Sequence, residues 1–147
     1  MSKASTALNT ILGQILAETY ALAVKTHAAH WNITGPQFFS LHAAFGTQYD
    51  ALFTAADDLA ERLRALGEKA PNGLKALAKI SEVSDIASHD GVALAKALAA
   101  DHTALSKLLA KGIAAAQAAG DEATADLFIG RTEEHDKTAW MLGAVAG

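Results

Sequence analysis

The sequence contains no cysteine among its 147 residues. This absence excludes disulfides, thiolate zinc sites and cysteine nucleophiles, so any metal chemistry must use nitrogen and oxygen ligands. Long hydrophobic runs are also missing, because no stretch approaches the roughly 20 apolar residues of a membrane span. Residues 1–6 do not lead into a signal-peptide pattern. We therefore expect an intracellular, cytoplasmic protein without membrane contact.

Proline and clusters of basic residues are equally scarce. The two prolines, Pro36 and Pro71, each fall where helical periodicity stops. The 12 lysines and arginines are outnumbered by 16 acidic residues, which gives a net charge of −4, and they are scattered along the chain. This distribution disfavours nucleic-acid recognition. No β-strand pattern, internal repeat or linker is present.

Apolar residues at helical spacing are abundant, and 51% of all residues are hydrophobic. Leucine and isoleucine recur every three to four positions in four long segments, and a shorter segment lies between the second and the third. The length fits one domain, residues 1–147. The expected helices cover residues 8–33, 41–66, 72–80, 94–119 and 121–145.

Residues at the ends of these segments support the boundaries. Gly67 and Gly120 follow the second and third long segments, at the position where glycine commonly ends a helix. Asn72 and Asp121 begin the short and the last long segment and are expected to cap them. Four long helices with one extended connection predict an all-α, ferritin-like four-helix bundle with a short extra helix between its second and third helices.

Two pairs of metal-binding side chains occur within this pattern. His30 and His42 flank the break between the first two helices, and Asp57 and Glu61 lie one turn apart on the second. At the helical rise per residue, Asp57 lies roughly 22 Å along the axis from His42, so one chain cannot readily bring both pairs to one ion. A two-fold partner with an antiparallel copy of the helix would join one subunit's histidines to the other's carboxylates, giving two equivalent sites per dimer.

A metal site inside a single bundle is not expected. Ferritin-like di-iron proteins build such a site from inward-facing Glu-x-x-His motifs. None of the six histidines has a glutamate three positions before it. The candidate site therefore lies between subunits.

Three segments together resemble one family. A His-Trp-Asn sequence starting at His30 ends the first helix, His42 follows twelve residues later, and an Asp-x-x-Ala-Glu-Arg turn starts at Asp57. This combination resembles Dps, the DNA-binding protein from starved cells, over nearly the whole chain. The resemblance implies a hollow homododecamer, built through two-fold and three-fold interfaces. It would oxidise Fe²⁺, preferably with hydrogen peroxide, and store a ferric mineral, which protects against oxidative stress.

The resemblance assigns iron binding and the ferroxidase reaction to the same four residues, His30, His42, Asp57 and Glu61. Imidazole nitrogens and carboxylate oxygens suit iron, and zinc is a second metal that such a set binds. Open coordination positions would let peroxide reach the metal, and the carboxylates would stabilise the added charge of Fe³⁺.

The neighbours of His30 have two interpretations each. Trp31 either intercepts a stray oxidising equivalent, as the resemblance suggests, or is an aromatic residue at an interface. His27, one turn before His30, either supports the site, from behind the ligands or at an interface, or binds a second cation, and the supporting role is favoured. Comparable partners are absent for the remaining histidines, His89, His102 and His135. The charged run 133–136 is interpreted as a solvated face.

The chain departs from the family pattern at Gly46. The family commonly has an acidic residue at this position, one turn after the second histidine, and Asp50 is another turn away. A bridging carboxylate is therefore missing. The number of irons per site stays open, because a second iron would bind weakly, through water, or only during oxidation.

Asp121 and Asp126 match positions where the family lines its three-fold pores with acidic side chains. The alternative is that they cap the last helix and interact with its positive end. Capping is favoured for Asp121, whereas the two roles are equally favoured for Asp126. The next turn offers no carboxylate, because Gly130 and Arg131 occupy it.

The alternative function is a nucleoid-associated DNA-binding protein with weak iron chemistry. Family members that bind DNA use a basic terminal extension, but only Lys3 precedes the first helix here and residues 144–147 are uncharged. Twelve copies would carry about −48, which opposes a polyanion unless divalent ions bridge the two. We therefore rank the ferroxidase first. A bundle kept only as a structural or signalling assembly is the third interpretation.

Overall fold

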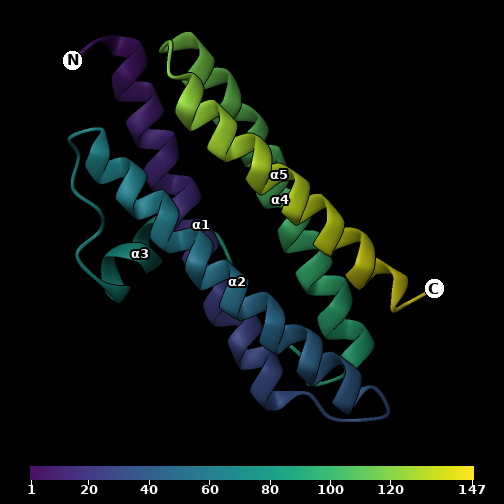
Figure 1. Ribbon diagram of the computed structural model, residues 1–147. Coiled ribbons are helices and arrows are strands. Elements are labelled where there is room, and N and C mark those ends of the chain that lie inside the picture. Colours follow the sequence, from purple (N-terminus) through teal and green to yellow (C-terminus); the bar gives the residue numbers. More distant parts are fainter.

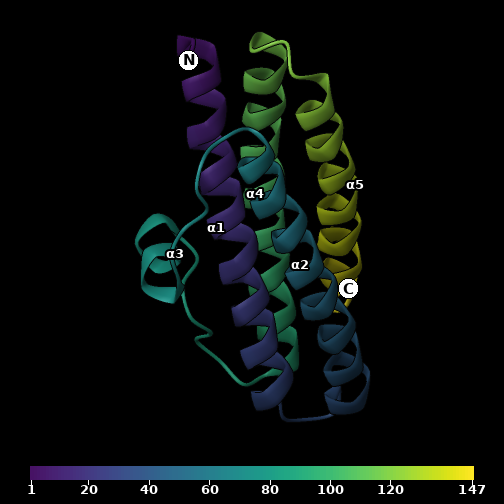
Figure 2. The same ribbon diagram turned by 60° about the vertical axis from the view of Figure 1, so that its left-hand side comes forward.

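The computed structural model describes residues 1–147 and contains five α-helices and no β-strand (Figure 1). The helices are α1 (Lys3–Asn32), α2 (Phe38–Ala65), α3 (Leu74–Ile80), α4 (Gly91–Ala118) and α5 (Glu122–Ala144). α1 packs along α2, α4 packs along α5, and α1 also contacts α4, so the two helix pairs form one bundle (Figure 2). The predicted all-α bundle is confirmed, with α3 beside α1 in the long connection.

Local signals explain where the long helices begin and end. Ser2 and Asp90 cap α1 and α4, each accepting the N–H of the residue three positions ahead at 3.0 Å. Gly67 and Gly120 have φ values of +93° and +71°, which L side chains rarely adopt. Both predicted glycine stops are therefore confirmed.

The predicted cap of α3 is wrong. Gly73, and not Asn72, occupies the N-cap position, and no side chain bonds to the first turn. Asn72 lies one residue too far out to reach the free amides of that turn. α3 buries none of its residues and rests on α1 through the partly buried Leu77.

The core runs along the axis of the bundle and is made of aliphatic and phenylalanine side chains from four helices. Its fully buried members include Leu12, Phe45, Leu59, Leu98 and Phe128. Burying a side chain of this kind contributes about 1.5–3 kcal/mol.

Gly112 allows the helices to approach closely. A Cβ atom there would lie 2.8 Å from Ile15 Cδ1 of α1 and 2.9 Å from the ring of Phe128 of α5. A side chain at this position would force both neighbours to move. The glycine therefore sets how near α4 lies to α1 and α5.

The turn between α1 and α2 is held in place by the start of α4. Gly35 has a φ of +102°, which permits the sharp change of direction before Pro36. The N–H of Thr34 donates to the carbonyl oxygen of His89 at 3.0 Å. This bond ties the turn that separates His30 from His42 to the second helix pair.

α1 is the one helix long and apolar enough to cross a membrane by length and composition alone, with a mean hydropathy of 1.2 in its most apolar window. Half of that window is buried inside the bundle. The core helix of a bundle passes the same test, so this property is weak evidence for a membrane span.

Candidate metal site

The structure brings the two predicted histidine ligands together where α1 ends and α2 begins. The rings of His30 and His42 stack with their centroids 3.7 Å apart and their planes at 15°. His30 Nδ1 lies 2.6 Å from the backbone oxygen of His42, and His42 Nδ1 lies 2.7 Å from the backbone oxygen of His30. Each imidazole is therefore oriented by the main chain of the other residue.

These two hydrogen bonds also determine the tautomers. A carbonyl oxygen only accepts, so each Nδ1 must carry the proton and donate it. When the rings are neutral, their Nε2 atoms then hold free lone pairs. A metal-binding histidine usually donates its other ring N–H to a carbonyl or carboxylate. The half-buried His30 and His42 are thus arranged as nitrogen ligands.

The predicted carboxylates, Asp57 and Glu61, are exposed on α2. They are four residues apart and so lie on one face of the helix. No three histidine, aspartate or glutamate side chains of the chain come close enough to hold a metal ion. The histidine pair and the carboxylate pair do not form one site within the subunit, and their completion by a partner stays a prediction.

Aromatic side chains surround the histidine pair. The His27 ring lies between Trp31 and Tyr49, with centroid distances of 4.1 Å to each, and it stacks on Tyr49 at 18°. Tyr49 also meets the edge of His30 at 5.3 Å. Sequence reasoning missed Tyr49, although it lies seven residues after His42 and therefore on the same face of α2.

Gly46 contacts the site directly. A Cβ atom there would lie 3.3 Å from His30 Cε1 and 3.4 Å from its Nδ1. The bare backbone thus packs against the ring of the first ligand. No carboxylate approaches His30 from this side.

Asp121 forms the predicted cap of α5 and an ion pair in addition. Its carboxylate accepts the N–H of Thr124 at 2.9 Å and pairs with Arg62 Nη2 at 2.9 Å. Burial raises the pKa of Asp121, but the bonds from Thr124 and the charge of Arg62 outweigh burial and lower it below its usual value. The carboxylate is therefore engaged within the subunit, whereas Asp126 is exposed.

The interpretation of His102 and His135 as unpartnered residues is wrong. Both are buried, with 2% and 1% of their surface exposed, and their Nδ1 atoms lie 2.8 Å apart. They come from α4 and α5 and are 33 residues apart, so no local pattern reveals the pair. The run 133–136 is consequently not a uniformly solvated face.

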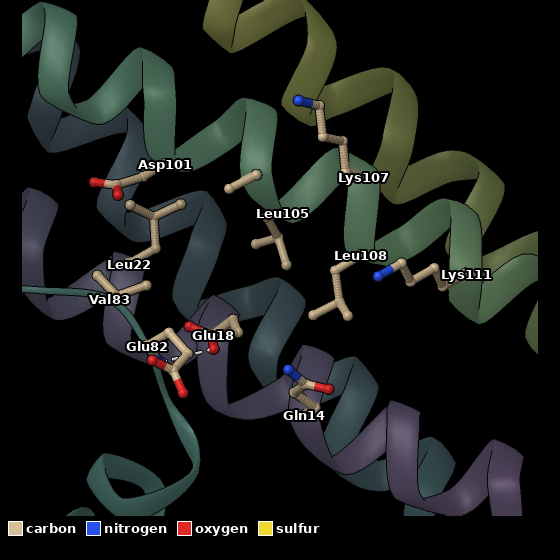
Figure 3. A pocket seen from close by; sticks show the side chains of 11 residues that line it. Gln14, Glu18, Leu22, Glu82, Val83, Asp101, Leu105, Lys107, Leu108 and Lys111 are labelled. Carbon is tan, nitrogen blue, oxygen red and sulfur yellow. Dashed lines mark hydrogen bonds between the residues drawn. The ribbon is translucent and has the colours of Figure 1, made fainter.

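A cavity of about 300 Å³ lies between α1, α4 and the segment that follows α3 (Figure 3). Its buried carboxylate is Glu18, whose oxygens accept bonds from the hydroxyl of Ser81 and the backbone N–H of Glu82, both at 2.8 Å. Nearby, Lys25 pairs with Asp101 at 2.7 Å. These polar groups hold the connection against the bundle.

Comparisons with known proteins identify the family. The ferritin-like domain model matches residues 9–147. The DNA protection during starvation protein 2 of Bacillus anthracis is 36% identical over 135 residues, which cover 91% of this chain and 92% of the relative. A DNA protection during starvation protein of Agrobacterium fabrum is 33% identical, with 97% and 90% covered. The chain belongs to the Dps family of ferritin-like proteins.

Solved structures of the Dps family share the fold. A Dps protein from Bacillus brevis has a TM-score of 0.96 at 28% identity, with 100% of this chain and 99% of that chain covered. The Dps protein of Vibrio cholerae has a TM-score of 0.93 at 30% identity, with 98% and 91% covered, and is described as a member of a broad superfamily of ferritin-like diiron-carboxylate proteins. The predicted Dps resemblance and ferritin-like fold are confirmed.

Proposed function

We propose that this Dps-family chain binds Fe²⁺ at sites shared by two subunits, oxidises it preferably with hydrogen peroxide, and stores the ferric product inside a dodecameric shell. The observation that carries the proposal is the reciprocal hydrogen bonding of His30 and His42, which leaves two Nε2 lone pairs fixed in orientation. The described membership of a relative in the diiron-carboxylate superfamily supports iron as the metal.

The distribution of exposed apolar side chains supports an assembled state. On the α1 and α3 side, Trp31 is 63% exposed and Leu74 is 68% exposed, and Val24 and Leu74 line one cavity. Phe39 at the start of α2 and Trp140 on α5 are also exposed. Soluble monomers rarely leave extended apolar patches open, and such patches mark interfaces. Subunit contacts would cover these exposed side chains.

The chain's own groups fit the reaction. Two Fe²⁺ ions each give up one electron, and one hydrogen peroxide takes both electrons and two protons to become two water molecules. His30 and His42 would supply neutral nitrogen ligands, and Asp57 and Glu61 of the adjoining subunit would favour the more highly charged product. The same set fits zinc, so Zn²⁺ would compete with iron.

Position 46 supplies no carboxylate, so the proposed site has two histidine and two carboxylate ligands, which hold one iron firmly. The second iron then binds more weakly and reacts only when the first is in place. Trp31 is exposed, as an interface residue would be, and it directly follows the proposed ligand His30, which would let it accept a stray oxidising equivalent. Asp126 is the better pore residue, because the Asp121 carboxylate is held by Arg62 and Thr124.

The shared site is tested by mixing two inactive variants, His30→Ala and Glu61→Gln. Each variant alone should lose nearly all peroxide-dependent Fe²⁺ oxidation. Co-assembled subunits should recover about a quarter of the wild-type sites, because half of the random dimers are mixed and each mixed dimer keeps one intact site. Stopped-flow absorbance of ferric product measures the recovery.

Two controls make this experiment decisive. Asp58→Asn changes an exposed neighbour of Asp57 and should leave the rate within about twofold. Native mass spectrometry should show that all variants form the same assembly. Full activity of either single variant would refute the ligand set, and inactive mixed assemblies would refute sharing between subunits.

A further inference from the structure

A second polar cluster lies inside the bundle, away from the candidate iron site. It lines a cavity of about 350 Å³ between α2 and α5, with α4 contributing His102. The polar side chains of this cavity that matter for its chemistry are Gln48, His102, Arg131, Glu134, His135 and Lys137. None of them belongs to the histidine and carboxylate set proposed to bind iron.

The hydrogen-bond network determines where the protons of this cluster lie. Arg131 has only donors, and its Nη2 lies 3.2 Å from His135 Nε2, so that ring nitrogen must be the acceptor. The proton of His135 is then on Nδ1, which donates to His102 Nδ1 at 2.8 Å. The proton of His102 is consequently on Nε2.

The far end of this chain of bonds is an N–H group without a protein partner. His102 Nε2 is buried and makes no hydrogen bond, and the same is true of Arg131 Nε and Gln48 Oε1. All three residues line the same cavity. Buried donors are nearly always satisfied, and the orphaned N–H groups therefore point to a ligand that accepts hydrogen bonds.

A metal ion does not fit this arrangement. The lone pair of His135 Nε2 faces Arg131, and the lone pair of His102 Nδ1 accepts from His135. No imidazole lone pair remains for a cation, and the permanent charge of Arg131 repels one. Among the lining residues Glu134 and Lys137 offset each other in formal charge and Arg131 adds one positive charge, while Glu134 and Asp58 both act on Arg131 electrostatically.

We propose that this cavity binds a small oxyanion, a phosphate or a carboxylate, through His102 Nε2–H and Arg131 Nε–H. Charged acceptors form the strongest hydrogen bonds with a guanidinium. The Gln48 carboxamide completes the site by rotating so that its NH₂ group faces the anion, since the two ends of an amide have nearly the same shape. The site would link α2, α4 and α5 through one bound ion.

Calorimetric titration of the metal-free assembled protein with inorganic phosphate and, separately, acetate tests this proposal. One anion should bind per subunit, and the arm that binds more tightly identifies the class. Arg131→Gln and His102→Phe should each weaken binding by about tenfold or more. Arg64→Gln, an exposed arginine on α2, is the matched control and should bind as the wild type does.

If chloride gives the same binding heats as phosphate and acetate, the proposal is overturned. Unchanged anion binding in the Arg131 and His102 variants would overturn it as well. If either variant fails to assemble, a crystal of the wild-type protein soaked in selenate gives an independent answer. An anomalous difference peak within hydrogen-bond distance of His102 Nε2 and Arg131 Nε supports the site. Water density alone at that position refutes it.

Discussion

His30 and His42 each use Nδ1 on the main chain of the other, so neither imidazole can turn without breaking its own hydrogen bond. A ligand whose orientation is already fixed loses little side-chain entropy when it binds. The pair is also placed correctly before any ion arrives, because Thr34 ties the intervening turn to the start of α4.

Gly46 offers the sharpest test at this scale. Gly46→Asp would add a carboxylate beside His30, where a Cβ atom lies 3.3 Å from the ring, and the imidazole must shift by a few tenths of an ångström. We expect the number of Fe²⁺ ions bound per site, measured by anaerobic titration, to rise from about one toward two.

Gly46→Asn is the matched control, because it adds the same Cβ and similar volume without the negative charge. It should leave the stoichiometry at the wild-type value. An equal gain in both variants would show that packing, and not a carboxylate ligand, controls the second iron.

The sequence proposes His30, His42 and the Asp57–Glu61 turn as ligands because they keep a fixed spacing along two helices, and their role as ligands stays a prediction. The reciprocal bonds were not predictable, since they depend on how the turn at Gly35 folds back. The pair of His102 and His135 was unpredictable for the same reason, because only the packing of α4 against α5 brings residues that distant together.

At the scale of the helices, two polar contacts fix the position of one helix along another, which apolar packing alone specifies less strictly. Arg62 of α2 reaches Asp121 at the start of α5, and the two buried histidines join the middle of α4 to α5. Burial, reinforced by the charge of Arg131, lowers the pKa of His102 to about 4, so this ring stays neutral at physiological pH.

The histidine contact predicts a pH-dependent stability. Burial, then the charges of His102 and Arg131, lower the pKa of His135 to about 2. Because unfolded histidines take up protons first as pH falls below 6.5, stability should be lost between about pH 6.5 and pH 4. For His102 alone the loss per subunit between pH 7 and pH 5 is on the order of 2 kcal/mol. Thermal unfolding at these two pH values measures it.

Replacing both rings, His102→Leu with His135→Leu, should flatten this dependence, whereas His89→Gln on the surface should not. Asp121 does not confuse the result, since its lowered pKa affects stability only as pH falls below the usual aspartate value of 3.8. A double variant as acid-sensitive as the wild type would contradict the assignment.

Helix boundaries could be predicted where a local signal decides them, as Gly67 and Gly120 do by adopting positive φ. The prediction that Asn72 caps α3 was wrong because Asn72 and Gly73 are neighbouring candidates for the N-cap position, and the chain geometry places Gly73 there. Similarly, the sequence places Asp121 at a helix start, but the added ion pair to Arg62 requires knowing that α2 ends beside α5.

At the scale of the whole molecule, the negative net charge disfavours DNA binding and leaves iron chemistry as the favoured function. Each chain carries −4, so a dodecamer would carry about −48 and repel a polyanion. We expect no retardation of duplex DNA in a gel-shift assay at physiological salt, and weak retardation when Mg²⁺ is added to bridge the two. Tight binding without Mg²⁺ would place DNA binding ahead of the ferroxidase.

A dodecameric assembly, as proposed, would account for two features of the single chain. Apolar residues such as Trp31 and Leu74 are exposed, and the proposed histidine ligands at the α1–α2 turn lie far from the carboxylates further along α2. The sequence predicts the separation of the ligands from the helical rise. It does not predict which apolar residues stay uncovered, because that depends on where α3 lies on α1.

The close helix packing at Gly112 bears on how accurately subunits would fit together in a shell. A Cβ atom at Gly112 would clash with Ile15 of α1 and Phe128 of α5, so the glycine lets α4 pack closer to both helices than a side chain would allow. In a closed container made of identical pieces, every angular error is repeated at each junction, and the last piece must still fit. In the proposed dodecameric shell, a distortion that an isolated subunit would tolerate would therefore hinder closure.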